Sequence, residues 1–129
     1  MAEDRDHFRK RLFDTFIKEA QLHMAAAPAF LGKLQQNASD AAALQNLLRE
    51  IHSLKGAASA VEQDDVAFVC RVLEQLIHKA LRGDKAVDAS FFELFQQGLD
   101  LLDTGLPAIT RDGQFIISLQ FLDSVRKLM

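Results

Sequence analysis

The sequence predicts an all-α fold: an antiparallel four-helix bundle with a flanking short helix and an extra C-terminal helix. Apolar residues recur at spacings of three and four along most of the chain, as in amphipathic helices. No segment alternates apolar and polar residues as a half-buried strand does. The connections between periodic segments are short, which favours antiparallel neighbours. We therefore expect one domain over 1–129, with a core of about 8–104 and a C-terminal helix of about 115–128.

The N-terminal part of the chain predicts two consecutive helices. Apolar residues between Leu12 and Met24 recur every three or four positions, which predicts a helix over about 4–26. Proline lacks the N–H that a helix interior uses, but it is tolerated in the first helical turn. Pro28 therefore predicts a break, followed by a short helix over about 28–38.

The middle of the chain predicts the two helices that carry its most informative polar residues. Ser39-Asp40 is an N-cap signal, so the next helix is expected over about 41–60. A turn at Gln63-Asp64-Asp65 then leads into a helix over about 65–82. Gly83 is well placed as the C-terminal stop of that helix.

The C-terminal part of the chain predicts two further helices. Asp88 can cap a helix over about 89–103, which Thr104-Gly105-Leu106-Pro107 is expected to end. After a turn at 111–113, Phe115 to Leu128 predicts a shorter helix.

Composition excludes several classes of protein. The net charge of −3 excludes a strongly basic nucleic-acid binder. Cys70 is the single cysteine, so no internal disulfide can form, and its apolar neighbours predict a buried thiol. No apolar run approaches the roughly 20 residues that cross a bilayer, and the charged N-terminus lacks the apolar region of a signal peptide. We expect a soluble, cytoplasmic chain with neither nucleic acid nor membrane as a partner.

The most informative residues lie around His52. With about 100° per residue, Lys55, Gly56 and Ser59 project on the same side of the helix as His52, beside the core-facing stripe. A neutral imidazole is a good nucleophile near pH 7. A lysine one turn away can offset the charge of an arriving phosphoryl group. Because glycine inside a helix costs about 1 kcal/mol relative to alanine, Gly56 indicates a place where a partner approaches the backbone.

Three further residues complete the predicted site. If the helices over 41–60 and 65–82 are antiparallel neighbours, Glu74 can accept a hydrogen bond from one imidazole nitrogen of His52 and leave the other free to attack. Arg49 and Arg71 add positive charge, which would suit docking to an acidic partner. The alternative is that both arginines are ordinary solvated charges.

The segments His52-Ser53-Leu54-Lys55-Gly56 and Cys70-Arg71-Val72-Leu73-Glu74 together resemble the histidine phosphotransfer domain. The length and the extra C-terminal helix look most like the N-terminal phosphotransfer domain of chemotaxis-type histidine kinases. The resemblance implies a four-helix bundle with an exposed phospho-accepting His52. It implies that Lys55 assists the phosphoryl group, that Glu74 orients the ring, and that Gly56 contacts a partner.

The resemblance also implies the partners. A histidine kinase ATP-binding domain or a receiver domain would phosphorylate the histidine, and a response-regulator receiver domain would take the group onto its aspartate. The receiver would also supply Mg²⁺, so this chain is expected to need no metal or cofactor. It has no glycine-rich nucleotide loop and is expected to bind no ATP by itself, although it could be one domain of a kinase.

One position departs from the family pattern. The family commonly has a glycine about ten residues after the histidine, where this sequence has Glu62. Either the turn is shifted to Gln63-Asp64, or the preceding helix runs longer. Both outcomes would alter the pairing of the two helices and with it the contact between Glu74 and His52.

The sequence leaves two other interpretations open. Glu19-x-x-x-His23 and Glu74-x-x-x-His78 make a di-metal carboxylate bundle conceivable, but that class uses Glu-x-x-His. We expect His7, His23 and His78 to be structural or merely exposed. The other alternative is a helical adaptor that binds a partner and carries no phosphate.

Overall fold

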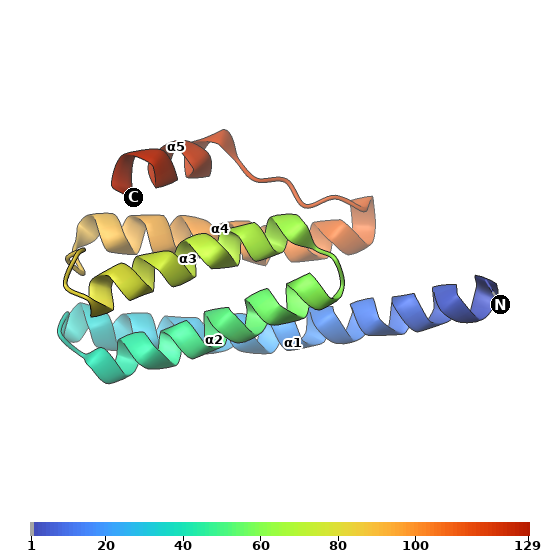
Figure 1. Ribbon diagram of the computed structural model, residues 1–129, viewed down its shortest axis with the longest axis horizontal. Coiled ribbons are helices and arrows are strands. Elements are labelled where there is room, and N and C mark those ends of the chain that lie inside the picture. The colour runs from blue at the N-terminus through green and yellow to red at the C-terminus, as the bar shows by residue number, and fades with distance from the viewer. Residues whose placement is uncertain (1) are drawn as a thin grey trace.

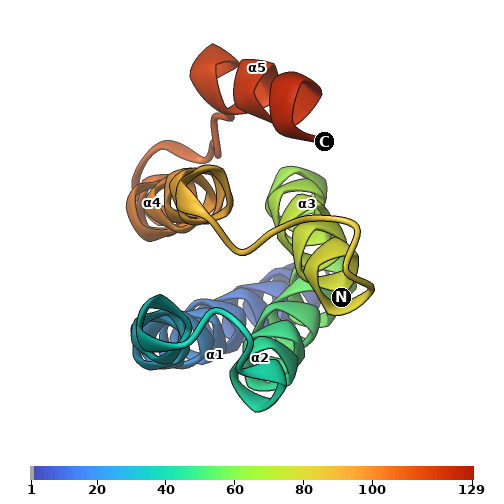
Figure 2. The same cartoon turned by 90° about the vertical axis from the view of Figure 1, so that its left-hand side faces the viewer.

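The computed structural model describes residues 2–129, apart from the side chains of residues 2, 3, 111 and 112. It contains the helices α1 (Ala2–Gln36), α2 (Ala41–Ala60), α3 (Asp64–Leu81), α4 (Ala89–Asp112) and α5 (Leu119–Leu128), and these described residues include no strand. Each of α1 to α4 runs antiparallel to the next, and α4 packs back on α1 to close the bundle (Figures 1 and 2). α5 lies outside the four and packs on α4. The all-α antiparallel bundle that the sequence predicts is confirmed.

The core is built from the apolar stripes of the four long helices, together with Phe115 from the connection after α4 and Phe121 from α5. Burying a large aliphatic or aromatic side chain contributes about 1.5–3 kcal/mol each, so these stripes hold the helices together. The largest side chains that are fully buried are Leu34, Leu47, Ile51, Leu54, Leu73, Leu76, Ile77, Phe91, Leu94, Phe95, Leu102 and Phe121.

The prediction of a break at Pro28 is wrong, because α1 is continuous through that residue. The stripe that buries Phe16 and Ala20 continues past the proline to Leu31 and Leu34. Proline in a helix interior costs about 3 kcal/mol, and burial of this stripe exceeds that cost. Pro28 itself lies on the exposed side. The separate short helix predicted over 28–38 is therefore, up to residue 36, the C-terminal quarter of α1.

The prediction that Thr104-Gly105-Leu106-Pro107 ends the next helix is also wrong, since α4 continues to Asp112. Leu106 and Ile109 are buried and extend the core stripe past the exposed Pro107. Gly105 is needed because the Phe115 ring packs directly on it: an added Cβ would lie 2.3 Å from that ring. α4 ends instead at Gly113, which has a φ of +74°, the left-handed conformation that glycine adopts without strain.

The last helix begins later than predicted. Residues 114–118 are not helical, and α5 starts at Leu119 instead of Phe115. Ser118 is its N-cap, with a side-chain oxygen that accepts a hydrogen bond from the backbone N–H of Phe121. A serine at this position is a common N-cap, but this cap was not predicted.

Three residues predicted to begin or end a helix are confirmed in that role. Asp40 caps α2 by accepting from the Ala43 N–H, and Asp88 caps α4 by accepting from the Phe91 N–H. Gly83 follows the end of α3 with a φ of +78°. Separately, none of the described helices is both long and apolar enough to cross a membrane.

Glu62 takes the conformation that a glycine would take at this turn. Its φ is +60°, and it is the one non-glycine residue with positive φ among those described. The Glu62 N–H donates to the Ser59 carbonyl, and the Gln63 N–H donates to the Ala58 carbonyl, which is the Schellman pattern of a helix C-terminus. The turn is therefore not shifted and α2 is not extended. The helices pair as they would with glycine at this position.

We expect Glu62→Gly to raise the free energy of unfolding by up to about 1 kcal/mol, because a left-handed conformation costs a residue with a Cβ about that much. Glu62 is exposed, so little else changes. Chemical denaturation would measure the effect. The control is Gln63→Gly, at a φ of −91°, which should be neutral or destabilising. If both glycines have the same effect, the strain assigned to Glu62 is absent.

Candidate functional site

His52 lies on the outer side of the α2–α3 pair. Its side chain is 69% exposed, and its Nδ1 is 2.6 Å from Glu74 Oε2 on α3. Ile51 and Leu54, its neighbours on α2, are buried in the core. Core packing of these two side chains therefore fixes the position of α2, while the imidazole projects into solvent. The contact between His52 and Glu74 that the sequence analysis considered is present.

Glu74 is the buried partner in this contact. Its side chain is 8% exposed, and among the described residues it is the one charged residue in the buried class. Burial by itself raises the pKa of the carboxyl. The hydrogen bonds and charges of Lys55 and His52 outweigh that effect, so that the pKa of Glu74 lies below its ordinary value of 4.5. The carboxylate is consequently ionised at neutral pH.

Lys55 forms the second contact of the carboxylate. Its Nζ makes an ion pair with Oε1, so the two oxygens of Glu74 are shared between Lys55 and His52. Lys55 lies three residues after His52 on α2, and its side chain is 29% exposed. The ammonium group is therefore close to the imidazole and still partly open to solvent. The ion pair itself was not part of the sequence prediction.

The ionised carboxylate fixes where the proton of the imidazole lies. A carboxylate without a proton can only accept, so Nδ1–H of His52 donates to Glu74 Oε2. In the neutral ring Nε2 then carries a lone pair. Since the ring is largely exposed, this nitrogen is open to an electrophile that arrives from solvent. The site thus presents an oriented imidazole with a cation one turn away on the same helix.

The surface beside His52 is open. Gly56 is exposed, and a Cβ added to it would meet no atom within 4 Å. Packing inside the chain therefore gives no reason for a glycine here. Ser59, Arg49 and Arg71 are exposed as well. The residues that the sequence analysis grouped on this side of the bundle do lie on its surface.

A second histidine makes a similar contact in a different setting. His23 Nδ1 on α1 is 2.6 Å from Glu50 Oε2 on α2, but the histidine side chain is only 30% exposed. The described ion pairs include no lysine on Glu50. No pattern in the sequence predicts this contact, since the two residues lie 27 positions apart. His7 and His78 are exposed, as expected.

The remaining candidate groups have structural explanations. Cys70 is fully buried, and burial, followed by the charge of Glu74, raises the pKa of its thiol to about 12. A thiol of this kind is inert. Among the described residues there is no group of three or more histidine, cysteine, aspartate or glutamate side chains that could hold a metal ion.

The chain is similar to known phosphotransfer proteins in sequence and in structure. It is 26% identical over 100 residues to the chemotaxis protein CheA of Bacillus subtilis strain 168, a match that covers 78% of this chain and 15% of CheA. The chain thus spans a small part of the length of that curated relative. Its fold matches the crystal structure of the phosphorylated P1 domain of CheA3 in complex with CheY6 from R. sphaeroides. That match has a TM-score of 0.79 and 19% identity, and covers 91% of this chain and 94% of the other.

The family model of the Hpt domain matches residues 11–105, well over half of the chain. The matched span contains His52, Lys55 and Glu74. The chain therefore belongs to the Hpt family, the histidine phosphotransfer domains of phosphorelay signalling.

Proposed function

We propose that His52 is the residue of this histidine phosphotransfer domain that accepts a phosphoryl group and passes it on. The observation that carries the proposal is the exposed imidazole whose Nδ1 is bonded to the buried, ionised Glu74. A solvated histidine has no fixed tautomer. This contact holds one nitrogen protonated and keeps the other available.

The transfer steps need no base on this chain. The lone pair of Nε2 attacks the phosphorus of the donor, the N–P bond forms, and the bond from phosphorus to the donor oxygen breaks with its electrons on that oxygen. In the onward step a receiver carboxylate attacks the phosphorus, and the N–P electrons return to Nε2. Because Nε2 carries no proton at the start, none has to leave. The role of Glu74 is that of a positioning residue, since it acts through the ring.

Lys55 is proposed to stabilise the charge of the phosphoryl group. In the unphosphorylated site its ammonium is paired with Glu74, and its partial exposure leaves it room to turn toward an anion. Phosphoryl transfer depends largely on positioning and charge stabilisation. A cation on the same helix, one turn from the nucleophile, supplies the second of these.

The partners are proposed from the same surface and from the relatives. The solved relative is in complex with CheY6, and we propose a response-regulator receiver domain as the acceptor. Gly56 and Ser59 would form the contact surface, and Arg49 and Arg71 would attract its acidic site. Mg²⁺ would be bound by the receiver and not by this chain. A histidine kinase ATP-binding domain as donor and a cytoplasmic location are further parts of this proposal.

We expect His52→Gln to abolish phosphorylation while the bundle stays folded, because the exposed ring contributes little to the core. The chain would be incubated with an active histidine kinase and ATP, or with a phosphorylated receiver. The label should be acid-labile and base-stable. The matched control is His23→Gln, which also removes a histidine bonded to a glutamate and should label normally. A wild-type chain that no donor labels would support the adaptor alternative.

We expect Lys55→Ala to slow transfer by roughly 10- to 100-fold, since a hydrogen bond to a charged group contributes about 1.5–3 kcal/mol. Lys55 is partly exposed, so the helix content should be unchanged in circular dichroism. Rapid-quench measurement of the transfer rate tests the role, and Lys55→Arg should retain part of the rate. A large loss of helicity in Lys55→Ala would mean that the lysine is structural.

We expect Glu74→Gln to remove one component of the acid dependence of stability. Folding lowers the pKa of Glu74 below 4.5. Its stabilisation is therefore fully present above the unfolded-state pKa and is lost as the pH falls through the folded-state value. Hydrogen bonds from Ser90 and Lys127 also lower the pKa values of Asp88 and Asp123. The difference between wild type and variant isolates the contribution of Glu74.

A spectroscopic measurement separates positioning by Glu74 from stability. The ¹⁵N NMR shifts of the His52 ring should show protonated Nδ1 in the wild type and a shift toward protonated Nε2 in Glu74→Gln. Transfer should slow in step with the lost tautomer. If the variant keeps the wild-type tautomer and is merely less stable, Glu74 does not orient the ring.

A further inference from the structure

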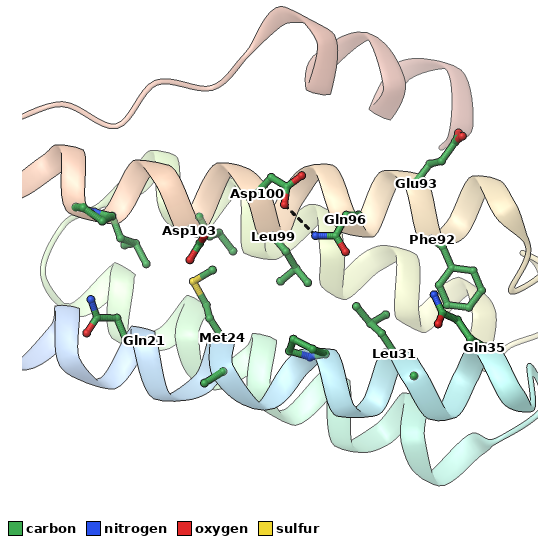
Figure 3. A pocket seen from close by; sticks show the side chains of 16 residues that line it. Gln21, Met24, Leu31, Gln35, Phe92, Glu93, Gln96, Leu99, Asp100 and Asp103 are labelled. Carbon is green, nitrogen blue, oxygen red and sulfur yellow. Dashed lines mark hydrogen bonds between the residues drawn. The ribbon is translucent and has the colours of Figure 1, made fainter.

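A groove runs between α1 and α4 (Figure 3). This pair of helices lies on the side of the bundle away from the pair α2–α3 (Figure 2). Its volume is about 820 Å³. The residues that line it on α1 extend from Gln21 to Gln35, a rise of about 21 Å at 1.5 Å per residue. This space is separate from His52 and takes no part in the proposed transfer.

The groove combines an apolar floor with acidic side chains. Met24 and Leu31 from α1 face Leu99 from α4 (Figure 3), and each of them is buried or partly buried. Glu93, Asp100 and Asp103 are exposed along α4, and the lining residues whose side chains the structure describes include no lysine or arginine. Such a surface suits a segment that is apolar on one side and basic beside it.

A glycine in the groove also indicates that a second segment binds there. Gly32 lies within α1, and a Cβ added to it would meet no atom within 4 Å. Glycine in a helix costs about 1 kcal/mol relative to alanine, and packing within the chain does not require this one. By contrast, Gly98 is required, since a Cβ there would lie 2.7 Å from Leu73. Close approach of a second segment to the α1 backbone would account for Gly32.

The chain itself carries a segment of matching chemistry, which we call the N-terminal arm and define as residues 4–14. The arm is the part of α1 that projects beyond the other helices (Figure 1). Its apolar side chains Phe8 and Leu12 are 55% and 45% exposed and lie one turn apart. Arg5 and Arg9 are spaced by one turn on one flank of these apolar side chains, and the arm as a whole carries four basic and three acidic side chains. Most of the arm precedes residue 11, where the match to the Hpt family begins.

From these features we propose that two copies of this chain form a symmetric dimer in which the N-terminal arm of each lies in the α1–α4 groove of the other. A helix of this length without tertiary contacts is marginal in water, and the groove would cover its apolar side. The arm is about 17 Å long, within the length of the groove. Arg5 and Arg9 would face the acidic residues of α4. The exchange is reciprocal, so the contact closes at two copies.

The position of the groove makes this dimer compatible with phosphotransfer. His52 of α2 is bonded to Glu74 of α3, whereas the groove is lined by α1 and α4. These two helix pairs lie on opposite sides of the bundle (Figure 2). Dimerisation would leave the imidazole open to its partners. The inference does not rest on the proposed role of His52, and either can fail without the other.

Sedimentation velocity over a range of concentrations tests the dimer. The wild-type chain should show a monomer–dimer equilibrium that added salt weakens, because ion pairs at the rim are screened. The double variants Phe8→Asp/Leu12→Asp in the arm and Asp100→Lys/Asp103→Lys in the groove should each weaken the dimer by at least roughly tenfold. The control is Leu22→Asp, an apolar α1 residue that is 72% exposed and outside the groove lining. It should behave as wild type.

A mixing experiment distinguishes the arm-in-groove contact from other dimers. The arm variant keeps an intact groove, and the groove variant keeps an intact arm. One of the two contacts can therefore form between them, and the mixture should contain heterodimers when each variant alone is monomeric. A wild-type chain that stays monomeric overturns the proposal. So does a dimer that persists in both double variants, or a mixture that forms no heterodimer. Circular dichroism would establish that each variant is folded.

Discussion

The site depends on one buried carboxylate shared between two side chains of the neighbouring helix. Glu74 on α3 meets His52 and Lys55 on α2, and each oxygen of the carboxylate has its own partner. Burial of a charge is costly unless it is paired and hydrogen-bonded. The pairing here holds the pKa of Glu74 low in spite of burial. The same contacts set the tautomer of the His52 ring and hold Lys55 beside it. Both the charge state of the carboxylate and the geometry of the site therefore result from the two contacts of Glu74.

The carboxylate can meet both partners only if α2 and α3 pair in one register, and the turn between them sets that register. Glu62 lies where the family usually has a glycine. Its backbone takes the left-handed conformation, and the position of the turn is unchanged. The cost is about 1 kcal/mol. A shifted turn would expose parts of the buried stripes of both helices, where each large side chain contributes more than that. Burial thus decides the backbone conformation at Glu62.

The elements that the sequence predicts well are those specified by residues close together. Asp40 and Asp88 act through a backbone N–H three residues on, and the bounds of α2 follow from its cap and its stripe. The breaks predicted near Pro28 and Pro107 were wrong because the expectation that proline ends a helix considers only the proline itself. Whether the proline faces solvent, and whether the stripe on either side of it is buried, depends on the other helices. For the same reason the grouping of His52 with Lys55 could be predicted along one helix, whereas the Lys55–Glu74 and His23–Glu50 pairs could not.

The glycines inside helices are of two kinds: those that the packing of the chain requires and those that it does not. At Gly98 and Gly105 an added Cβ would collide with Leu73 or Phe115, so the packing of the chain explains them. At Gly56 and Gly32 it would meet nothing, although each costs its helix about as much stability. One of these two lies beside the exposed imidazole and the other lines the α1–α4 groove. We propose that another molecule approaches each of these two glycines, so that this small bundle would use two opposite faces for two different contacts.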